Sequence, residues 1–375
     1  MIYNESKYNQ QWKTKKLSEL GMFARGKSKH RPRNDERLFE GGGYPLVQTG
    51  EIKDANLYIT HHEQEYGDFG LKQSKLWNTG TLCITIAANI AETAILAYPM
   101  CFPDSIVGFS AYPEKSSEKF MYYIFEYIKK SIQNAATGSI QDNINIDYLT
   151  SLDFKVPSKK YQDEMVMLLS AIDEKILLNS EINDNLAAMA YEIYMHTFFS
   201  KKPNAKLKDI LTEAEKSSIQ VGEAKISNGK YPFFTSGSTI LKWNEPFVDG
   251  RNCFLNTGGN ADVKFYVGKA AYSTDTWSVS AKSEMSDYLY LMLFSIKPEL
   301  DQKFFQGTGL KHLQKPLLKD RPIYVPEKKE LEVFNRQVMP MFDIVSENTR
   351  ENQQLISLRD WLLPMLMNGQ ATISD

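Results

Sequence analysis

The chain has 375 residues, a length that suggests two or three domains, and its net charge of −2 excludes a uniformly basic nucleic-acid-binding protein. Its hydrophobic content of 42% is enough for packed cores. The three cysteines lie far apart, without a C-x-x-C pair, and the five histidines show no metal-binding spacing. We therefore expect a reducing compartment, no disulfide framework and no metal site.

The N-terminal residues 1–16 lack the apolar core of a signal peptide. The next segment of interest, GMFARGKS at residues 21–28, matches the phosphate-loop pattern G-x-x-x-x-G-K-[ST]. A phosphate loop follows a buried strand and opens a helix, but the preceding residues are polar and lysine-rich. Pro32 also falls where the first helical turn would form. The sequence thus disfavours a phosphate-loop nucleotidase, which is kept as an alternative.

The same segment belongs to residues 7–33, which contain nine basic residues and one acidic residue, Glu19. A solvated basic face is one interpretation. We favour DNA binding, because concentrated Lys and Arg beside flexible glycine suit phosphate contacts, and each neutralised phosphate releases a counterion. The nine basic residues are Lys7, Lys13, Lys15, Lys16, Arg25, Lys27, Lys29, Arg31 and Arg33.

The most apolar stretch covers residues 81–98. It carries Asn89 and Glu92 and is closed by Pro99, which predicts buried strands rather than a membrane span. We expect a soluble cytoplasmic protein.

The sequence contains an internal repeat, in which the first copy has extra residues within positions 53–80. One fold with different loop lengths suits a binding platform with two different targets. A helix cap is predicted at Ser117 in the first copy and at Ser286 in the second. The matched positions are Lys16 with Lys206, Tyr44 with Tyr231, Cys83 with Cys253, Ser117 and Glu118 with Ser286 and Asp287, Phe125 with Phe294, Gly138 with Gly307, and Val156 and Pro157 with Val325 and Pro326.

Each copy ends in a long helical pattern whose seam positions alternate in steps of three and four, as in a coiled coil. Ordinary core packing is the alternative explanation of such a stripe. The seam positions are Leu169, Ile172, Ile176, Leu186, Ala190 and Ile193 in the first copy, and Val338, Met341, Val345, Leu355, Arg359 and Leu362 in the second.

Two further seam positions hold asparagine in both copies, Asn179 with Asn348 and Asn183 with Asn352. A buried asparagine lowers stability but fixes the register of a helix pair, because only one alignment pairs the amides. We therefore predict that the two helices pack on each other in antiparallel orientation.

The chain resembles the specificity subunit of type I restriction–modification enzymes over essentially its whole length. The resemblance rests on KLSELGMFARGKS with YPLVQTGEI, on ATGSIQDNINIDYLTSLDFKVPS before the first helix, and on GTGLKHLQKPLLKDRPIYVPEKKE before the second. The second copy has no equivalent of the glycine and lysine residues of GMFARGKS, so that part of the resemblance applies to the first domain only.

The resemblance implies an α/β (α+β) fold of two similar target-recognition domains joined by two long antiparallel helices, with an internal pseudo-two-fold repeat. The expected boundaries are residues 1–158 for the first recognition domain, 159–200 for the first helix, 201–326 for the second domain, and 327–375 for the second helix and tail.

The resemblance also implies a non-catalytic subunit that reads a split, asymmetric DNA site, one half per domain. Its expected partners are double-stranded DNA, two modification (methyltransferase) subunits, and restriction (translocase–nuclease) subunits. S-adenosylmethionine is expected on the modification subunits, and ATP with Mg on the restriction subunits.

Candidate DNA contacts follow from side-chain chemistry: Lys, Arg and hydroxyls for phosphates, and paired donors and acceptors for base edges. Simple turn chemistry is the alternative for each Ser, Thr and Asn. In the first domain the candidates are Arg25, Lys27, Ser28, Lys29 and Arg31 for the backbone, and Gln48, Thr49 and Glu51, after a predicted strand, for bases. In the second they are Thr235, Ser236, Ser238, Lys242, Asn244, Asn256, Asn260, Lys311 and His312.

Two further functions are compatible with the sequence. One is a protein–protein scaffold built on the long helices without a DNA role. The second is the specificity subunit of a different multisubunit DNA modification system of similar layout.

Overall fold

The computed structural model describes residues 6, 8–137, 144–307 and 309–373. Lys7, Gly138 and Thr308, which belong to predicted motifs, lie outside the described residues. The chain divides into unit 1, which comprises Met1–Lys175 and Leu355–Asp375, and unit 2, Ile176–Gln354. Within the described ranges, no helix combines the length and the apolar character needed to cross a bilayer.

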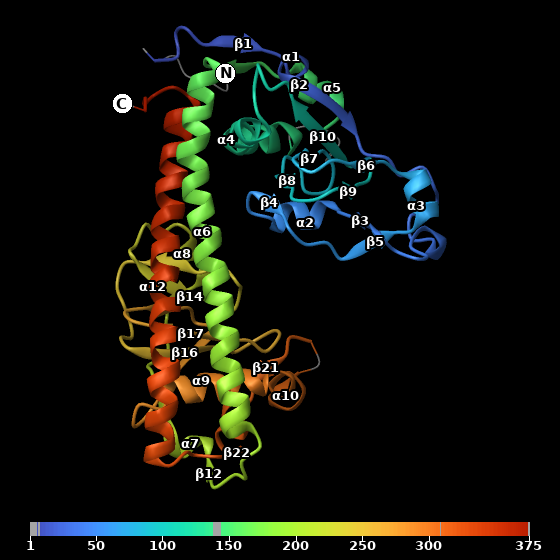
Figure 1. Cartoon of the computed structure of the whole chain (residues 1–375). Coiled ribbons are helices and arrows are strands. Elements are labelled where there is room, and N and C mark those ends of the chain that lie inside the picture. Colours follow the sequence, from blue (N-terminus) through green and yellow to red (C-terminus); the bar gives the residue numbers. More distant parts are fainter. Residues whose placement is uncertain (1–5, 7, 138–143, 308, 374–375) are drawn as a thin grey trace. The chain divides into compact units, whose positions relative to one another are not determined.

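Two long helices, α6 (Lys159–Tyr194) and α12 (Lys328–Met367), each contribute residues to both units (Figure 1). The remaining elements mix short strands and helices in both units. This confirms the predicted class of two similar α+β domains with two long helices. The four predicted domain ranges remain a prediction, since the compact units divide the chain within both long helices.

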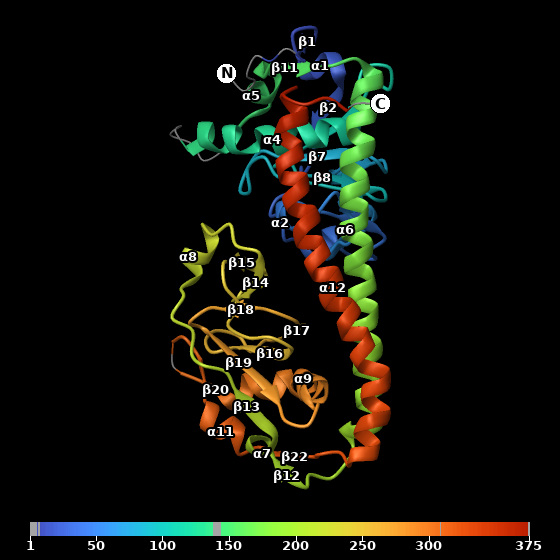
Figure 2. The ribbon, with the colours of Figure 1, turned by 90° about the vertical axis from the view of Figure 1, so that its left-hand side faces the viewer.

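Unit 1 contains a five-stranded sheet of order β2-β10-β7-β8-β4, a four-stranded sheet of order β5-β3-β9-β6, and the pair β1-β11. Helix α4 packs against β7 and β8 (Figure 2). The strands are β1 (Lys13–Lys15), β2 (Gly21–Arg25), β3 (Tyr44–Leu46), β4 (Tyr58–Ile59), β5 (Gln64–Tyr66), β6 (Leu76–Trp77), β7 (Leu82–Thr85), β8 (Thr93–Leu96), β9 (Met100–Cys101), β10 (Ile106–Ala111) and β11 (Phe154–Val156). The helices are α1 (Leu17–Leu20), η1 (Glu36–Leu38), α2 (Thr49–Asp54), α3 (Asp68–Gln73), α4 (Glu118–Thr137) and α5 (Ile146–Ser151).

Unit 2 contains a four-stranded sheet of order β13-β19-β16-β17, a three-stranded sheet of order β15-β14-β18, and the pairs β12-β22 and β20-β21. Helix α9 packs against β16, β17 and β19 (Figure 2). The strands are β12 (Ala205–Lys206), β13 (Leu211–Glu213), β14 (Tyr231–Phe234), β15 (Leu241–Trp243), β16 (Arg251–Asn256), β17 (Val263–Val267), β18 (Ala271–Tyr272), β19 (Thr276–Ala281), β20 (Phe305–Gln306), β21 (His312–Leu313) and β22 (Pro322–Ile323). The helices are η2 (Met195–Phe199), α7 (Leu207–Ile210), α8 (Val221–Lys225), α9 (Ser286–Ser295), α10 (Lys297–Glu299), η3 (Leu300–Phe304) and α11 (Lys315–Lys319).

The predicted internal repeat is confirmed element by element. Strands β2, β10, β7 and β8 of unit 1 have the same order as β13, β19, β16 and β17 of unit 2. Cys83 and Cys253 are both fully buried on the third of these strands, β7 and β16. Strand β3 pairs in parallel with β9, as β14 does with β18. Within residues 53–80 of the first copy, β4 and β6 have no counterpart in the sheets of unit 2, whereas β5 pairs with β3 as β15 does with β14.

One detail of the repeat differs from the prediction, and one matched pair differs in exposure. Ser117 caps α4 by accepting a hydrogen bond from the Phe120 N–H at 3.2 Å, but Ser286 accepts from the Ala281 N–H instead and caps nothing. The predicted cap on α9 is therefore wrong, because that hydroxyl ties the helix to the end of β19. Phe125 is fully buried, whereas the matched Phe294 is 37% exposed.

The apolar stripes of the long helices lie in two environments. In unit 1, Leu169 of α6 joins a core that contains Phe125 and Leu366. In unit 2, Ala190 of α6 and Val338 of α12 belong to a second core. Ordinary core packing thus accounts for these parts of the stripe.

In unit 2 the predicted asparagine pairing is present. The Asn179 amide donates to Asn352 Oδ1 at 2.9 Å, and the Asn348 amide donates to Asn183 Oδ1 at 2.9 Å. The second bond lies later along α6 but earlier along α12 than the first, so the two helices run antiparallel. Each bond joins one asparagine of the first copy to the non-equivalent one of the second, as a local two-fold axis requires.

Arg359, a charged seam residue that matches the apolar Ala190 of the first copy, has a structural explanation within unit 1. Its guanidinium lies 2.9 Å from the Asp173 carboxylate, which also accepts a 2.6 Å hydrogen bond from the Tyr123 hydroxyl. Arg359 therefore neutralises a carboxylate that is only 8% exposed.

Replacing Asn179 with Leu is expected to lower the free energy of unfolding by about 1–3 kcal/mol, because its half-buried partners Glu351 and Asn352 lose a hydrogen bond. Asn179 is 1% exposed and also donates to Glu351 at 2.6 Å. Denaturant unfolding of the variant measures the loss. The double replacement Asn179→Leu with Asn352→Leu should recover part of it, and an unchanged midpoint in the single variant would contradict the pairing.

Candidate nucleic-acid interface

Strands β2 and β7 flank β10 and run in the same direction. Both pair antiparallel with β10, and Val107 of β10 lies opposite both Arg25 and Ile84. The chain therefore leaves both strands at the same edge of the sheet. We call this place the loop edge of unit 1; it comprises residues 26–33 after β2, residues 86–92 between β7 and β8, and residues 103–105 before β10.

The basic segment is held at the loop edge by its main chain. The N–H of Lys27 donates to Phe102 O at 3.2 Å, and the N–H of Lys29 donates to Gln73 O at 3.1 Å. The Ser74 hydroxyl donates to Lys27 O at 2.9 Å. These bonds use only the backbone of the segment and leave its side chains free to make other contacts.

The side chains of the basic segment fall into two groups. Arg33 lies 2.5 Å and Arg31 3.8 Å from the Asp104 carboxylate, and Arg31 also donates to His30 O. Arg25, Lys27 and Lys29 are exposed, and no carboxylate of the described residues pairs with them. Ser28 is half-buried. The three unpaired cations are the ones best suited to phosphates.

The glycines of GMFARGKS have a packing explanation. A Cβ on Gly21 would lie 2.3 Å from Ser110 O, and one on Gly26 would lie 2.2 Å from Pro103 O. Residues 21–25 form the extended strand β2, and no helix follows Ser28 directly. This is not the strand–loop–helix arrangement of a phosphate loop.

The predicted base readers of the first domain follow β3, at the start of α2. Glu51 is committed to the backbone, because its two oxygens accept from the N–H groups of Gln48 and Glu63 at 2.7 and 3.0 Å. The exposed Gln48 donates to Gln64 Oε1 at 2.7 Å. Thr49 O accepts from the Asn89 amide at 3.4 Å, which brings this segment to the loop edge.

Unit 2 has the equivalent edge. Val279 of β19 lies opposite both Glu213 of β13 and Cys253 of β16. We call residues 256–262, between β16 and β17, together with residues 273–275 before β19, the loop edge of unit 2.

Three of the predicted segments meet at the loop edge of unit 2. The Asn256 amide donates to Ser236 O at 3.0 Å and to Asn260 O at 3.1 Å. The Gly259 N–H donates to Lys311 O at 3.0 Å, and Gly258 forms a bridge with His312. Residues 235–238, 256–260 and 311–312, distant in sequence, are therefore neighbours.

The members of this cluster differ in exposure. Thr235 and Asn256 are 6% and 5% exposed, and Thr235 accepts from the Gly237 N–H, so both shape the turns. Ser238, Asn260 and His312 are exposed, and Ser236 is half-buried. The side-chain bond to Lys311 holds the pKa of Asp301 below its usual range and keeps that lysine at the edge.

Two candidates lie elsewhere. Lys242 belongs to β15, and its ammonium donates to Gln353 O of α12 at 3.3 Å. Asn244 is exposed just after the same strand. No described contact brings either residue to the loop edge, because the β14–β15 hairpin carries Lys242 toward the helix.

Sequence reasoning missed the turn between β7 and β8, residues 86–92. The signal was available, because the alignment of Cys83 with Cys253 places this turn opposite residues 256–262. Its apolar letters, IAANIAE, are equally typical of a buried stretch, which hid the turn.

Residues 9–188 and 201–357 match the family model described as "Type I restriction modification DNA specificity domain". The chain is 20% identical to the type I restriction enzyme MjaIX specificity subunit of Methanocaldococcus jannaschii over 414 residues, which cover 97% of this chain and 94% of that protein. It is 22% identical to the HindI specificity subunit of Haemophilus influenzae, over 65% of this chain and 74% of that protein.

Among solved structures, the S subunit of a type I restriction–modification system from M. genitalium has the same fold. The TM-score is 0.63 at 15% identity, and the match covers 98% of this chain and 99% of that one. Since the family model covers both halves of the sequence, the chain belongs to the family of DNA specificity subunits of type I restriction–modification systems.

Proposed function

We propose that this chain is a non-catalytic cytoplasmic subunit that reads a split, asymmetric DNA sequence, with one half-site for each unit. It docks two methyltransferase subunits, which supply S-adenosylmethionine, and restriction subunits that use ATP and Mg join the complex. The chain itself supplies sequence recognition and assembly.

The observation that carries this proposal is the repetition of the loop edge on two equivalent sheets. The strand order is the same in both units, but the residues at the edge differ. Unit 1 presents Arg25, Lys27 and Lys29, whereas unit 2 presents Ser238, Asn260 and His312. One framework with two sets of loops can read two different base sequences.

The exposed apolar side chains of the long helices support partner docking. Met167, Leu178 and Met189 of α6 are 68%, 51% and 53% exposed. Val333 and Trp361 of α12 are 55% and 59% exposed. Large apolar side chains in such numbers favour protein partners over permanent contact with water.

Replacing residues 201–326 with the equivalent domain of a relative tests the proposal. The assembled methyltransferase complex should then methylate a motif in which one half-site is changed and the other is retained. Sequencing of methylated DNA gives the motif. A change in both half-sites would contradict one half-site per unit.

A further inference from the structure

The β7–β8 turn, residues 86–92, occupies in unit 1 the place that residues 256–262 occupy in unit 2. Each turn is bonded to a segment that comes later in the chain, after the helices that follow the sheet. In unit 1 the Ile144 N–H donates to Ile86 O at 3.1 Å, and in unit 2 the Leu313 N–H donates to Thr257 O at 3.0 Å. The two turns therefore have the same neighbours as well as the same place in the sheet.

Each turn also contacts the segment that follows the first strand of the smaller sheet. In unit 2 the contact is Asn256 Nδ2 to Ser236 O, at 3.0 Å. In unit 1 it is Asn89 Nδ2 to Thr49 O, at 3.4 Å. An asparagine thus joins the same two segments in both units, from a different position within each turn.

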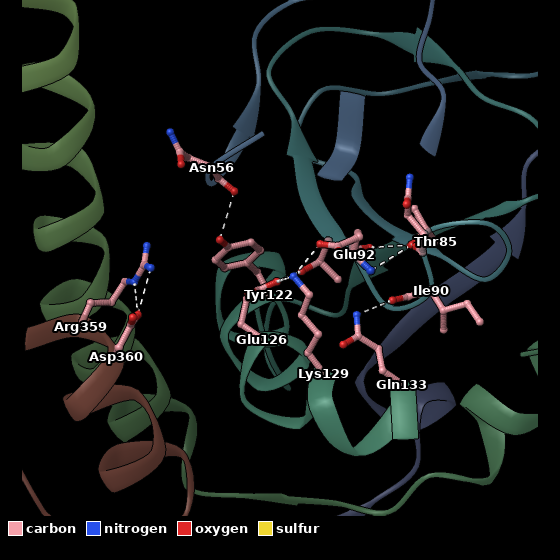
Figure 3. A network of polar contacts seen from close by, with 12 residues as sticks. Asn56, Thr85, Ile90, Glu92, Tyr122, Glu126, Lys129, Gln133, Arg359 and Asp360 are labelled. Carbon is pink, nitrogen blue, oxygen red and sulfur yellow. Dashed lines mark hydrogen bonds and ion pairs between the residues drawn. The ribbon is translucent and has the colours of Figure 1, made fainter. Parts of the chain in front are cut away.

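An ion pair anchors each turn to a helix of its own unit. Glu92 lies 2.5 Å from the Lys129 ammonium of α4, and Asp262 lies 2.8 Å from Lys297 of α10. Figure 3 shows that Gln133 of α4 reaches the same turn, where its amide donates to Ile90 O at 3.0 Å. The turn in unit 1 is therefore fixed at both its middle and its end.

The backbone of this turn is strained. Ala88 and Ala91 have φ values of 64° and 60°, in the left-handed region that residues with a Cβ rarely adopt. The Thr85 hydroxyl holds the conformation, because it donates to Asn89 O and accepts from the Glu92 N–H at 2.9 Å. Strain that is held in place by several bonds is typical of functional sites.

Asn89 lies at the centre of this fixed turn and is half-exposed, at the same edge of the sheet as the basic segment that leaves β2. Its amide offers one donor and one acceptor side by side, the pattern that pairs with adenine N7 and N6 in the major groove. Among described residues, the one hydrogen bond of this side-chain amide is the 3.4 Å contact to Thr49 O.

We propose that Asn89 is a specificity-determining residue that reads an adenine–thymine pair of the half-site recognised by unit 1. The inference rests on the proposed function. The strained turn and its anchors on α4 are positioning elements that fix the amide in place, so little conformational freedom is lost when DNA binds.

The test uses the assembled methyltransferase complex with Asn89→Ala, and the methylated motif is read by sequencing. Discrimination at one base pair of one half-site is expected to fall about 10- to 100-fold, with the other half-site unchanged. Asn89→Asp, which keeps the shape and removes the donor, should alter the preference at the same position. An unchanged motif in both variants would overturn the inference.

The matched control is Asn78→Ala. Asn78 is also exposed, but it precedes β7 at the opposite end of the strand, and Thr81 bonds only its main-chain oxygen. This variant should keep the wild-type motif; loss of the same base pair would overturn the inference. If the wild-type complex itself shows no split motif, the proposed function fails and this inference with it.

Discussion

Replacing Arg251 with Met is expected to lower the free energy of unfolding by about 3–5 kcal/mol, because it leaves a buried carboxylate without its partner. The guanidinium makes two bonds to Asp287, at 2.6 and 2.8 Å, and Asp287 is fully buried. It also reaches Asp343 at 2.6 Å and Met339 O at 2.8 Å, both on α12. Arg251 therefore joins β16, α9 and α12 within unit 2, and denaturant unfolding measures its loss.

The loss should depend on pH. Burial raises the pKa of Asp287 even with Arg251 present, and removal of the cation raises it further. A carboxyl whose folded-state pKa is raised binds its proton more tightly when folded, so acid favours the folded variant. The stability lost in the Arg251→Met variant should therefore decrease as the pH falls toward the ordinary pKa range of aspartate and increase as the pH rises.

Two controls separate the buried charge from a general effect of removing arginine. The double variant Arg251→Met with Asp287→Asn should be more stable than the single variant at neutral pH, because no unpaired charge remains. Arg33→Met breaks the exposed pair with Asp104 and should change stability by less than about 1 kcal/mol. Equal losses for Arg33 and Arg251 would contradict the explanation.

Replacing Lys27 and Lys29 together with Ala is expected to weaken binding to every DNA duplex, whether or not it carries the target sequence. If each lysine contacts one phosphate, the slope of log K against log salt falls by about 1.8, and affinity at 0.15 M salt falls about 30-fold. Titrations of the assembled complex with target and non-target duplexes at several salt concentrations measure both quantities.

The matched control for this prediction is Lys328→Ala with Lys329→Ala, two exposed lysines at the start of α12. This variant should keep the wild-type salt slope. An unchanged slope in the Lys27 and Lys29 variant would show that the basic segment does not contact DNA phosphates. A loss confined to the target duplex would assign these lysines to base reading instead.

The repeat and the helix pairing could be predicted because both are periodic features of the sequence. Buried strands need apolar residues at fixed intervals, so Cys83 and Cys253 align without structural information. Asparagine at matched seam positions such as Asn179 is unusual enough to identify the pair, and the structure confirms it.

The detail of the interface could not be predicted, because it depends on which polar side chains the backbone uses for itself. Asn256 and Glu51 have the chemistry of base readers, yet both are bonded to main-chain groups. Lys242 is directed to α12 by the β14–β15 hairpin, where its ammonium bonds to Gln353, a residue distant in sequence. Asn89 was missed because its neighbours are apolar and resemble a buried stretch, whereas the sheet register shows that they form a turn.

Sequencing of methylated positions in DNA from cells that carry this chain with its partner subunits would show whether two reading units act together. The expected motif is asymmetric and consists of two specified half-sites separated by a gap of unspecified bases, with methylated adenines. A continuous motif, or a palindromic one in which both halves are read identically, would contradict the assignment of one half-site to each unit.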